Sequence, residues 1–251
     1  MASMSATDAL PTLISLAAKA TATQLDRLPA ASLAALPPAT KARLLTEAIA
    51  ARALNDDVLK HLGQHHVELS LRGSRVSDRG LGFMIAGTGG TRLLRLDLAR
   101  CTQLRDTGIV ELAKHCPQLR SLDLSHCRLT DVAFEAVARD CRDLRALDAS
   151  WNGSGVGERT VRALAAHSQR LEQLSVCGCR VRDDALLALA CACPRLTKLG
   201  TRGCDMLTEA GIVAALCTLP RILNLDLCQV SRLSEPSIHI LLSRASQATH
   251  L

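Results

Sequence analysis

Eleven cysteines are the side chains of this sequence that most readily suggest chemistry. Thiolates bind soft metals and take part in redox reactions, and Cys177-x-Cys179 with Cys191-x-Cys193 could supply four metal ligands. Their spacing differs from the C-x-x-C pairs of zinc ribbons. Cys179 and Cys193 also stand where cysteine recurs along the chain, so we expect buried structural thiols and predict no metal or cofactor. A thiol metal-binding protein is the alternative interpretation.

Glycines and histidines offer weaker candidates. Gly153-Ser-Gly155-Val-Gly157 does not have the G-x-G-x-x-G spacing of a dinucleotide loop, and Gly87-Thr-Gly89-Gly90 lacks the lysine and hydroxyl of a phosphate loop. We predict that both are turns. His61 and His65 lie four residues apart but lack the glutamate of H-E-x-x-H. No nucleophile motif accompanies them, so the sequence predicts neither catalytic residues nor an enzyme.

The chain contains an internal repeat, which predicts where the cysteines lie in the fold. A pair of the Leu-x-Leu type recurs seven times at intervals of 25 to 27 residues, which is the period of leucine-rich repeats. Another apolar residue precedes most pairs by three positions, and a cysteine or asparagine follows most pairs by five. Val230 takes that last position in the seventh unit, which predicts a degraded final repeat. The pairs begin at Leu69, Leu96, Leu122, Leu147, Leu174, Leu199 and Leu225.

Each pair is followed by signals for a helix. An acidic residue comes nine to eleven positions after the pair begins, and Ser or Thr precedes it in four units, as in a capped first helical turn. Pro117, Pro194 and Pro220 prevent three of the helices from continuing. The alternation predicts an α/β right-handed solenoid, or horseshoe, of about seven leucine-rich repeats with a parallel concave sheet and outer helices. The acidic residues are Asp78, Asp106, Asp131, Glu158, Asp183, Glu209 and Glu235.

Composition divides the chain into three segments. Residues 1–24 are rich in Ala, Ser and Thr and are predicted to be a disordered tail. Residues 25–64 are predicted to be a helical N-terminal cap, with short helices around Gln24–Leu36, Ala39–Leu54 and Asp56–His65. Residues 65–251 carry the cysteine-containing leucine-rich repeats.

The outward-facing residues of the strands form the candidate binding surface. The residue between the two core positions of each strand points away from the core, which places Asp97, Asp123 and Asp148 about 5 Å apart. Such neighbours repel one another unless cations or a partner offset their charge. Arg72, Arg100, His126, Trp151 and Arg202 stand at the strand exits, and exposed tryptophan is enriched at binding hot spots. We predict a protein partner on this concave face; a solvated acidic stripe is the alternative. The predicted residues are Arg95, Asp97, Arg100, Asp123, His126, Asp148, Trp151 and Arg202.

The repeats resemble the cysteine-containing repeats of F-box/LRR substrate receptors of cullin-RING ubiquitin ligases. The order of the whole chain resembles the Amn1 family, whose founding member antagonises the mitotic exit network. The matching features are Leu36-Pro37-Pro38 with Lys41, Arg43 and Leu44, then Asn55-Asp56-Asp57, then residues 67–71 and Val76-Ser77-Asp78, all ahead of the cysteine repeats.

This resemblance implies a non-catalytic protein-protein interaction module. It would be an Amn1-like regulator or a target-recognition subunit associated with an SCF-type ligase, ubiquitin-dependent degradation and the cell cycle. Leu36-Pro37 is similar to an incomplete F-box opening, so a cullin-RING ligase adaptor bound at the N-terminal cap is an alternative. A purely structural scaffold is another.

Composition restricts the classes of partner further. Hydrophobic residues make up 48% of the chain and aromatic residues 1%, so the core must be aliphatic. The net charge of +6 is modest for a nucleic-acid binder, which also tends to stack bases on aromatic rings, so we expect no nucleic acid. No uncharged apolar run approaches the roughly 20 residues that span a bilayer, and the first 18 residues lack the basic start of a secretory signal. We expect a cytoplasmic and/or nuclear protein with reduced thiols and no membrane contact.

Overall fold

The computed structural model describes residues 33, 36–51, 53–63, 66–88, 92–226 and 234–240. The predicted tail, most of the first predicted cap helix and Val230 lie outside these residues. Within them, seven short strands alternate with helices, which confirms the predicted α/β leucine-rich-repeat solenoid. The elements are α3 (Pro38–Ala50), α4 (Asp56–Leu62), β1 (Glu68–Ser70), α5 (Asp78–Thr88), β2 (Arg95–Asp97), α6 (Asp106–His115), β3 (Ser121–Asp123), α7 (Asp131–Asp140), β4 (Ala146–Asp148), η2 (Gly153–Gly155), α8 (Glu158–His167), β5 (Gln173–Ser175), α9 (Asp183–Ala192), β6 (Lys198–Gly200), α10 (Glu209–Thr218) and β7 (Asn224–Asp226).

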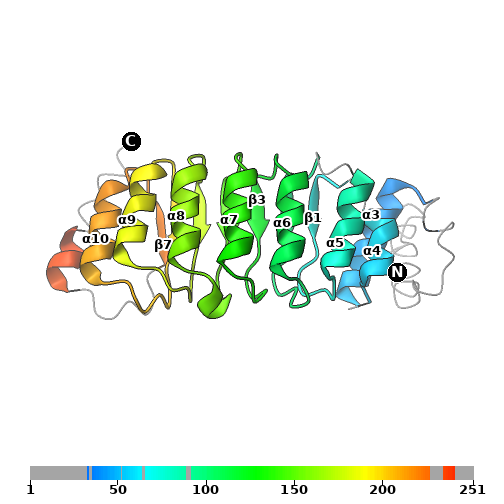
Figure 1. The fold of residues 1–251 in the computed structure, drawn as a ribbon, viewed down its shortest axis with the longest axis horizontal. Helices are drawn as coiled ribbons and strands as arrows, with labels where there is room; N and C mark the ends of the chain where they lie inside the picture. Colours follow the sequence, from blue (N-terminus) through cyan, green and yellow to red (C-terminus); the bar gives the residue numbers. More distant parts are fainter. Residues whose placement is uncertain are drawn as a thin grey trace, which may run out of the picture.

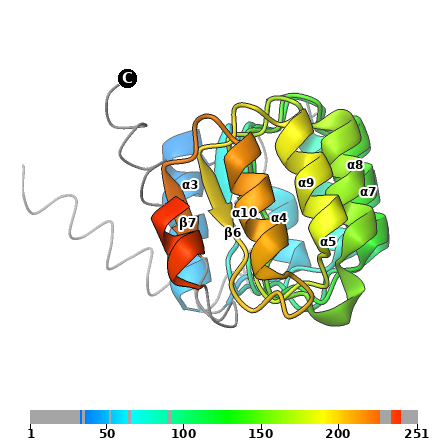
Figure 2. The same cartoon turned by 90° about the vertical axis from the view of Figure 1, so that its left-hand side faces the viewer.

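The seven strands form one parallel sheet in chain order, from β1 to β7. The register places the core leucine of each strand beside its equivalent, as in Leu96, Leu122 and Leu147. Helices α4 to α10 stand side by side in front of the sheet (Figure 1). Seen from the C-terminal end, strands β6 and β7 lie on one side of the molecule and helices α7 to α9 on the other (Figure 2).

The core between the sheet and the helices is aliphatic. One cluster of buried Leu, Ile, Val, Ala and Cys side chains continues from Leu33 to Leu219, and Phe134 is the largest fully buried side chain. Each repeat buries its leucines against both neighbours, so stacking supplies a core that is almost wholly aliphatic. Among the described residues, no helix is long and apolar enough to cross a bilayer.

The helices begin where the acidic residues predict. Six helices, α5 to α10, start at the predicted Asp or Glu, and residues 235–240 are also helical. The hydroxyl oxygens of Thr130 and Thr208 accept hydrogen bonds from backbone N–H groups of α7 and α10 at 3.3 and 3.2 Å, as N-caps do. Helices α6, α9 and α10 end just before Pro117, Pro194 and Pro220.

At the start of six of the described helices the acidic residue also bonds the next repeat, a connection that we call a junction link. The Asp183 carboxylate accepts hydrogen bonds from the backbone N–H of Thr208 at 2.8 Å and from its hydroxyl at 2.5 Å. The third residue of the next helix must then be small, because a Cβ on Gly211 would lie 2.0 Å from Cγ of Asp183. The other links join Asp56 to Ser77, Asp78 to Thr107, Asp106 to Thr130, Asp131 to Thr160 and Glu209 to Ser234.

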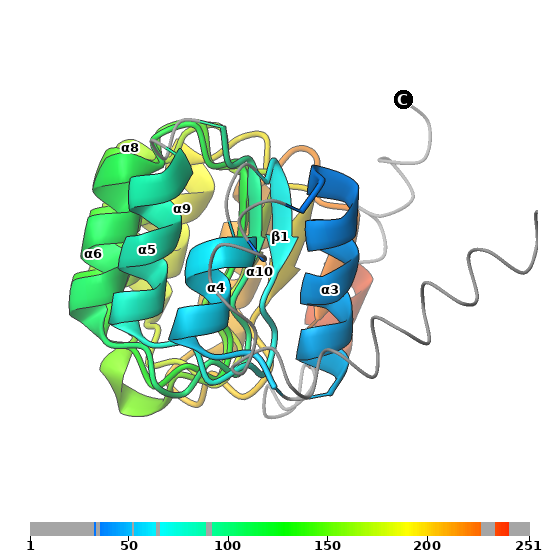
Figure 3. The same cartoon turned by 90° about the vertical axis from the view of Figure 1, so that its right-hand side faces the viewer.

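Two helices cover the first strand. Helix α4 continues the row of outer helices, whereas α3 lies on the other side of β1 (Figure 3). Leu45 of α3 and Leu59 of α4 are buried in the same apolar cluster as the repeats. The helices predicted around residues 39–54 and 56–65 correspond to α3 and α4, which end at Ala50 and Leu62.

Candidate functional site: the concave face

Three aspartates lie in register on the exposed side of the sheet. Strand pairing aligns Asp97 with Asp123 and Asp123 with Asp148. One carboxylate oxygen of each accepts a hydrogen bond from the backbone N–H two residues later, at 2.9 to 3.0 Å. These bonds fix the orientation of the carboxylates at the ends of β2, β3 and β4. The three side chains lie on the side of the sheet that the alternation of strand residues predicts.

Arg72 neutralises two of the three aspartates. Its Nε donates to the second carboxylate oxygen of Asp97 at 3.0 Å, and its Nη2 donates to that of Asp123 at 2.7 Å. The hydrogen bond to Asp97 raises the pKa of Arg72 above its ordinary value. Asp148 has no ion-pair partner within the described ranges. The predicted site omits Arg72; the signal that could have found it is its place two residues after Ser70, on the same face of the chain.

A column of left-handed residues follows the strands. Gly73, Gly178 and Gly203 adopt φ near +70° at the position just before the recurring turn cysteine or Ser74, a conformation that glycine tolerates. The three intervening repeats place Arg100, His126 and Trp151 there, with φ of 62°, 59° and 59°. A left-handed conformation costs a residue with a side chain roughly 1–2 kcal/mol. We call Arg100, His126 and Trp151 the strained column.

The aromatic part of this column is exposed but ordered by stacking. Trp151 is 44% exposed. Its ring stacks on that of His126, with ring centroids 6.1 Å apart and ring planes inclined by 16°. On its other side the indole covers Gly178, where a Cβ would lie only 2.5 Å from the ring. The next repeat therefore needs glycine for two reasons, its positive φ and the ring above it.

A shallow hollow of about 190 Å³ lies in the middle of the face. Asp123 and Asp148 line it together with Gln173, Ser175 and Lys198 of β5 and β6. The predicted site does not include these last three residues. Their positions in the rows of outward-facing strand residues are the signal that identifies them.

The structure groups most of the predicted residues and separates one. Arg95, Asp97, Asp123 and Asp148 project from β2, β3 and β4, and the strained column stands at the exits of the same strands. Arg95 forms an exposed ion pair with Glu68 at 2.8 Å. Arg202 lies two strands beyond Asp148, in the turn after β6, so it is set apart from the other seven predicted residues.

The thiols that suggested metal chemistry are mostly buried donors. The Sγ atoms of Cys101, Cys127 and Cys204 donate to carbonyl oxygens of the preceding repeat at 3.0 to 3.1 Å. Burial raises the pKa of the Cys127 and Cys141 thiols to about 12, which keeps them protonated and poorly nucleophilic. Across the described ranges, no group of three or more His, Cys, Asp or Glu side chains is arranged to hold a metal ion.

The other motifs have structural explanations where they are described. Gly153–Gly155 forms the 3-10 turn η2, and a Cβ on Gly155 would lie 2.7 Å from the carbonyl oxygen of Leu129, so glycine allows this turn to pack on the previous repeat. His61 lies in α4, while His65 is outside the described residues.

Comparisons with known proteins agree with this architecture. A family model described as "Leucine Rich repeat" matches residues 115–138. The antagonist of mitotic exit network protein 1 (Amn1) of Eremothecium gossypii is 35% identical over 147 residues, which cover 57% of this chain and 31% of that protein. F-box protein SKIP19 of Arabidopsis thaliana is 28% identical over 127 residues, which cover 51% of this chain and 42% of that protein. The matches thus span less than half the length of either relative.

A solved structure with the same fold is that of the Rad7 and Elc1 complex in yeast. It matches with a TM-score of 0.50 and 16% identity, over 98% of this chain and 79% of that chain. The parallel sheet and the match to the leucine-rich-repeat family model show that the chain is built of leucine-rich repeats, and over 57% of its length its sequence is similar to that of Amn1.

Proposed function

We propose that this chain is a non-catalytic interaction module whose concave face binds a partner protein. The observation that carries the proposal is the strained column, because three successive repeats hold a left-handed residue with a side chain at one and the same position beside the exposed aspartates. Glycine would satisfy the same backbone in all three repeats, yet the chain presents a guanidinium, an imidazole and an indole instead. With the aspartates beside them, they offer an anchor of the kind found at binding hot spots. The proposed contact residues are Arg95, Asp97, Arg100, Asp123, His126, Asp148, Trp151 and Arg202.

The biological setting of the proposal is regulation linked to ubiquitin ligation and the cell cycle, in the cytoplasm and/or nucleus. Its support is the similarity to a protein named as an antagonist of the mitotic exit network and to one named as an F-box protein. As part of the proposal, residues 25–64 serve as the N-terminal cap, and α3 is the surface at which a cullin-RING ligase adaptor would bind. A hollow of about 250 Å³ between α3 and β1, lined in part by Ala42, Leu45 and Ile49, supports this assignment.

Glycine substitutions test the concave face without damaging the fold. We would purify the tagged protein and its partners from cells and identify them by mass spectrometry. The His126→Gly/Trp151→Gly variant removes both rings and relieves the positive φ, so it should fold normally and lose the partner. Arg128→Gly is the matched control, because Arg128 also has φ of 62° but is not a proposed contact. A partner that both variants retain at full recovery would overturn the proposed face.

A second pair of variants tests the adaptor. Ala42→Glu places a charge on the exposed part of α3 that lines the hollow, and Ala39→Glu places the same charge on the same helix outside it. Cullin-ligase subunits that are recovered with the wild type and Ala39→Glu, but not with Ala42→Glu, would support adaptor binding at α3. Absence of ligase subunits from the wild-type sample would remove the ligase from the proposal and leave the concave partner unaffected.

A further inference from the structure

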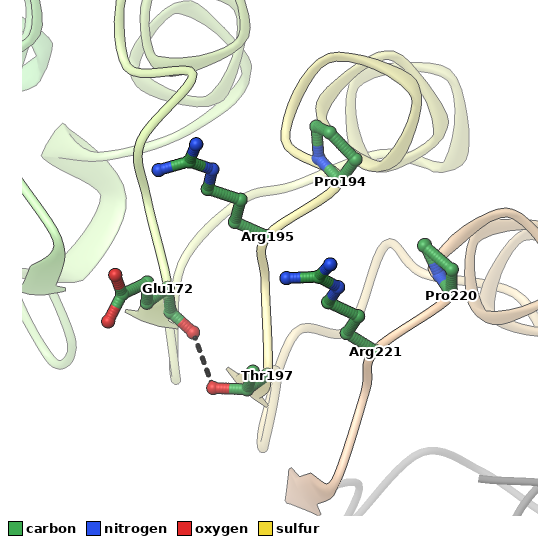
Figure 4. Close-up of a pocket in the computed structure, with 6 residues that line it drawn as sticks. All are labelled: Glu172, Pro194, Arg195, Thr197, Pro220 and Arg221. Atoms are coloured by element: carbon green, nitrogen blue, oxygen red, sulfur yellow. Dashed lines mark hydrogen bonds between the residues drawn. The ribbon is translucent and has the colours of Figure 1, made fainter. Parts of the chain in front are cut away.

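A second surface lies on the edge of the solenoid formed by the turns that return from each helix to the next strand. The turns after α9 and α10 both begin with Pro-Arg, at Pro194-Arg195 and Pro220-Arg221. These residues line an open hollow of about 480 Å³, which Glu172 and Thr197 complete. Both guanidinium groups extend in the same direction from adjacent turns, while the carboxylate of Glu172 is directed away from them (Figure 4).

The two arginines lack the counter-charges that earlier repeats provide. Arg170, one repeat before Arg195, forms an ion pair with Asp143, and Arg145 forms one with Glu172. In the part of the chain that the structure describes, neither Arg195 nor Arg221 has a carboxylate partner. Three consecutive repeats therefore carry arginine at the same turn position, namely Arg170, Arg195 and Arg221. Of these, Arg170 is neutralised by an ion pair.

The rest of the hollow is already hydrogen-bonded. The hydroxyl of Thr197 donates to the backbone carbonyl of Glu172 at 3.0 Å, and the backbone N–H of Thr197 donates to the same oxygen at 2.8 Å. Neither arginine side chain has a hydrogen bond to a helix-end carbonyl within the described ranges, so capping of α9 or α10 does not explain their orientation. The guanidinium groups are thus the donors that the hollow offers to a ligand.

We propose that this hollow is a second docking site, distinct from the concave face, for an acidic segment of a partner protein. A guanidinium is a planar fork that binds a carboxylate through two parallel hydrogen bonds, and two forks on adjacent repeats fit two carboxylates. Side chains two residues apart on an extended chain are separated by about 7 Å, which the long arginine side chains can match across neighbouring turns. The rings of Pro194 and Pro220 form the apolar walls against which such a chain packs.

The test uses a fluorescein-labelled peptide of twelve residues with alternating glutamate and serine. Binding to the full chain is measured by fluorescence anisotropy at low and high salt. The Arg195→Glu/Arg221→Glu variant should bind at least about tenfold more weakly, since each lost charge-assisted pair weakens binding by about that factor. The Arg195→Lys/Arg221→Lys variant keeps the charge without the fork and should bind with intermediate affinity.

A control with the same change in net charge separates local recognition from general attraction. Arg75 and Arg105 are exposed on the opposite edge, and Arg75→Glu/Arg105→Glu should change the affinity by less than about twofold. Equal weakening in both glutamate variants would overturn the proposal, as would the absence of peptide binding by the wild type. A twelve-nucleotide single-stranded DNA that binds more tightly than the peptide, and depends on Arg195 and Arg221, would replace the acidic peptide with a nucleic acid.

Discussion

At the residue scale, most polar groups inside the repeats have a partner, and two hydroxyls do not. The Asn152 amide shows the usual arrangement, because it donates to three carbonyls and accepts from the backbone N–H groups of Cys127 and Leu129. The hydroxyls of Thr201 and Ser168 are buried without a hydrogen bond within the described residues. Thr201 takes a position that Leu, Val or Ala holds in other repeats, so its hydroxyl is a local cost to stability.

We predict that Thr201→Val raises the free energy of unfolding by about 1 kcal/mol, because it removes an unsatisfied hydroxyl without changing the volume. Urea unfolding followed by circular dichroism measures this change. Thr160→Val is the matched control and should destabilise the protein, since that hydroxyl donates to Asp131 at 2.6 Å. Equal effects of the two substitutions would contradict the assignment.

The buried thiols predict how stability depends on pH. Burial raises the pKa of Cys127 and Cys141 to about 12, whereas their thiols ionise near 9 when the chain is unfolded. The folded state therefore binds more protons above pH 9, and stability falls as pH rises from there towards 12. We expect a loss of about 1 kcal/mol per thiol between pH 9 and pH 10, measured by urea unfolding under reducing conditions. The Cys127→Ala/Cys141→Ala variant should show a shallower fall over the same range.

At the element scale, the junction links explain why the helices stack in register. Each link ties the start of one helix to the chain at the start of the next helix or just ahead of it. The carboxylate also has a favourable place in the first turn of its own helix. The sequence predicts that these carboxylates lie in the first turns of the helices. It did not reveal the links, because they depend on how closely successive helices approach.

We predict that Asp183→Ala lowers the free energy of unfolding by about 1–2 kcal/mol, because it leaves the N–H and hydroxyl of Thr208 without their acceptor. Asp184→Ala removes the neighbouring carboxylate, whose contact is an exposed ion pair with Arg162, and should change stability by less than about 0.5 kcal/mol. Urea midpoints of the two variants provide the comparison. A similar loss in both would show that general charge, and not the link, is responsible.

The small residue in the link gives a second prediction. Gly211→Ala should destabilise the protein, because the new Cβ would overlap Asp183. In the Asp183→Ala background the same substitution should destabilise the protein less, because Cγ and Oδ1 at 2.0 and 2.2 Å are removed while Cβ of residue 183, at 2.5 Å, remains. A double-mutant cycle on urea unfolding measures this coupling. Additive effects would show that the two side chains do not compete for space.

At the scale of the whole molecule, the sequence predicts the repeat and not the contacts that cross several repeats. The strands, helix starts and aliphatic core follow from a local period of about 26 residues, which each unit restates. The bridge from Arg72 to Asp123 spans three strands and depends on side-chain reach. The left-handed backbone of Trp151 could be inferred only by aligning it with Gly178 and Gly203.

In a solenoid of this kind, the position of a destabilising substitution should decide which repeats unfold. We predict that Phe134→Ala, in the middle of the array, lowers the free energy of unfolding by about 3–5 kcal/mol. Leu225→Ala, on the partly exposed strand β7, should mainly release the last repeats. Hydrogen exchange with mass spectrometry distinguishes the two outcomes, because protection of β2 to β4 should survive only the second substitution. Loss of protection throughout the chain in both variants would instead indicate a single cooperative unit.

The junction links also bear on how such a protein can change in length. One unit carries the carboxylate that bonds the next unit and the small helical residue that makes room for the preceding one, as Asp106 and Gly108 do within a single turn. An in-frame duplication of a unit would therefore copy both halves of the junction together. Gene duplication could lengthen the array, and unequal recombination shorten it, without any compensating mutation where the copies meet.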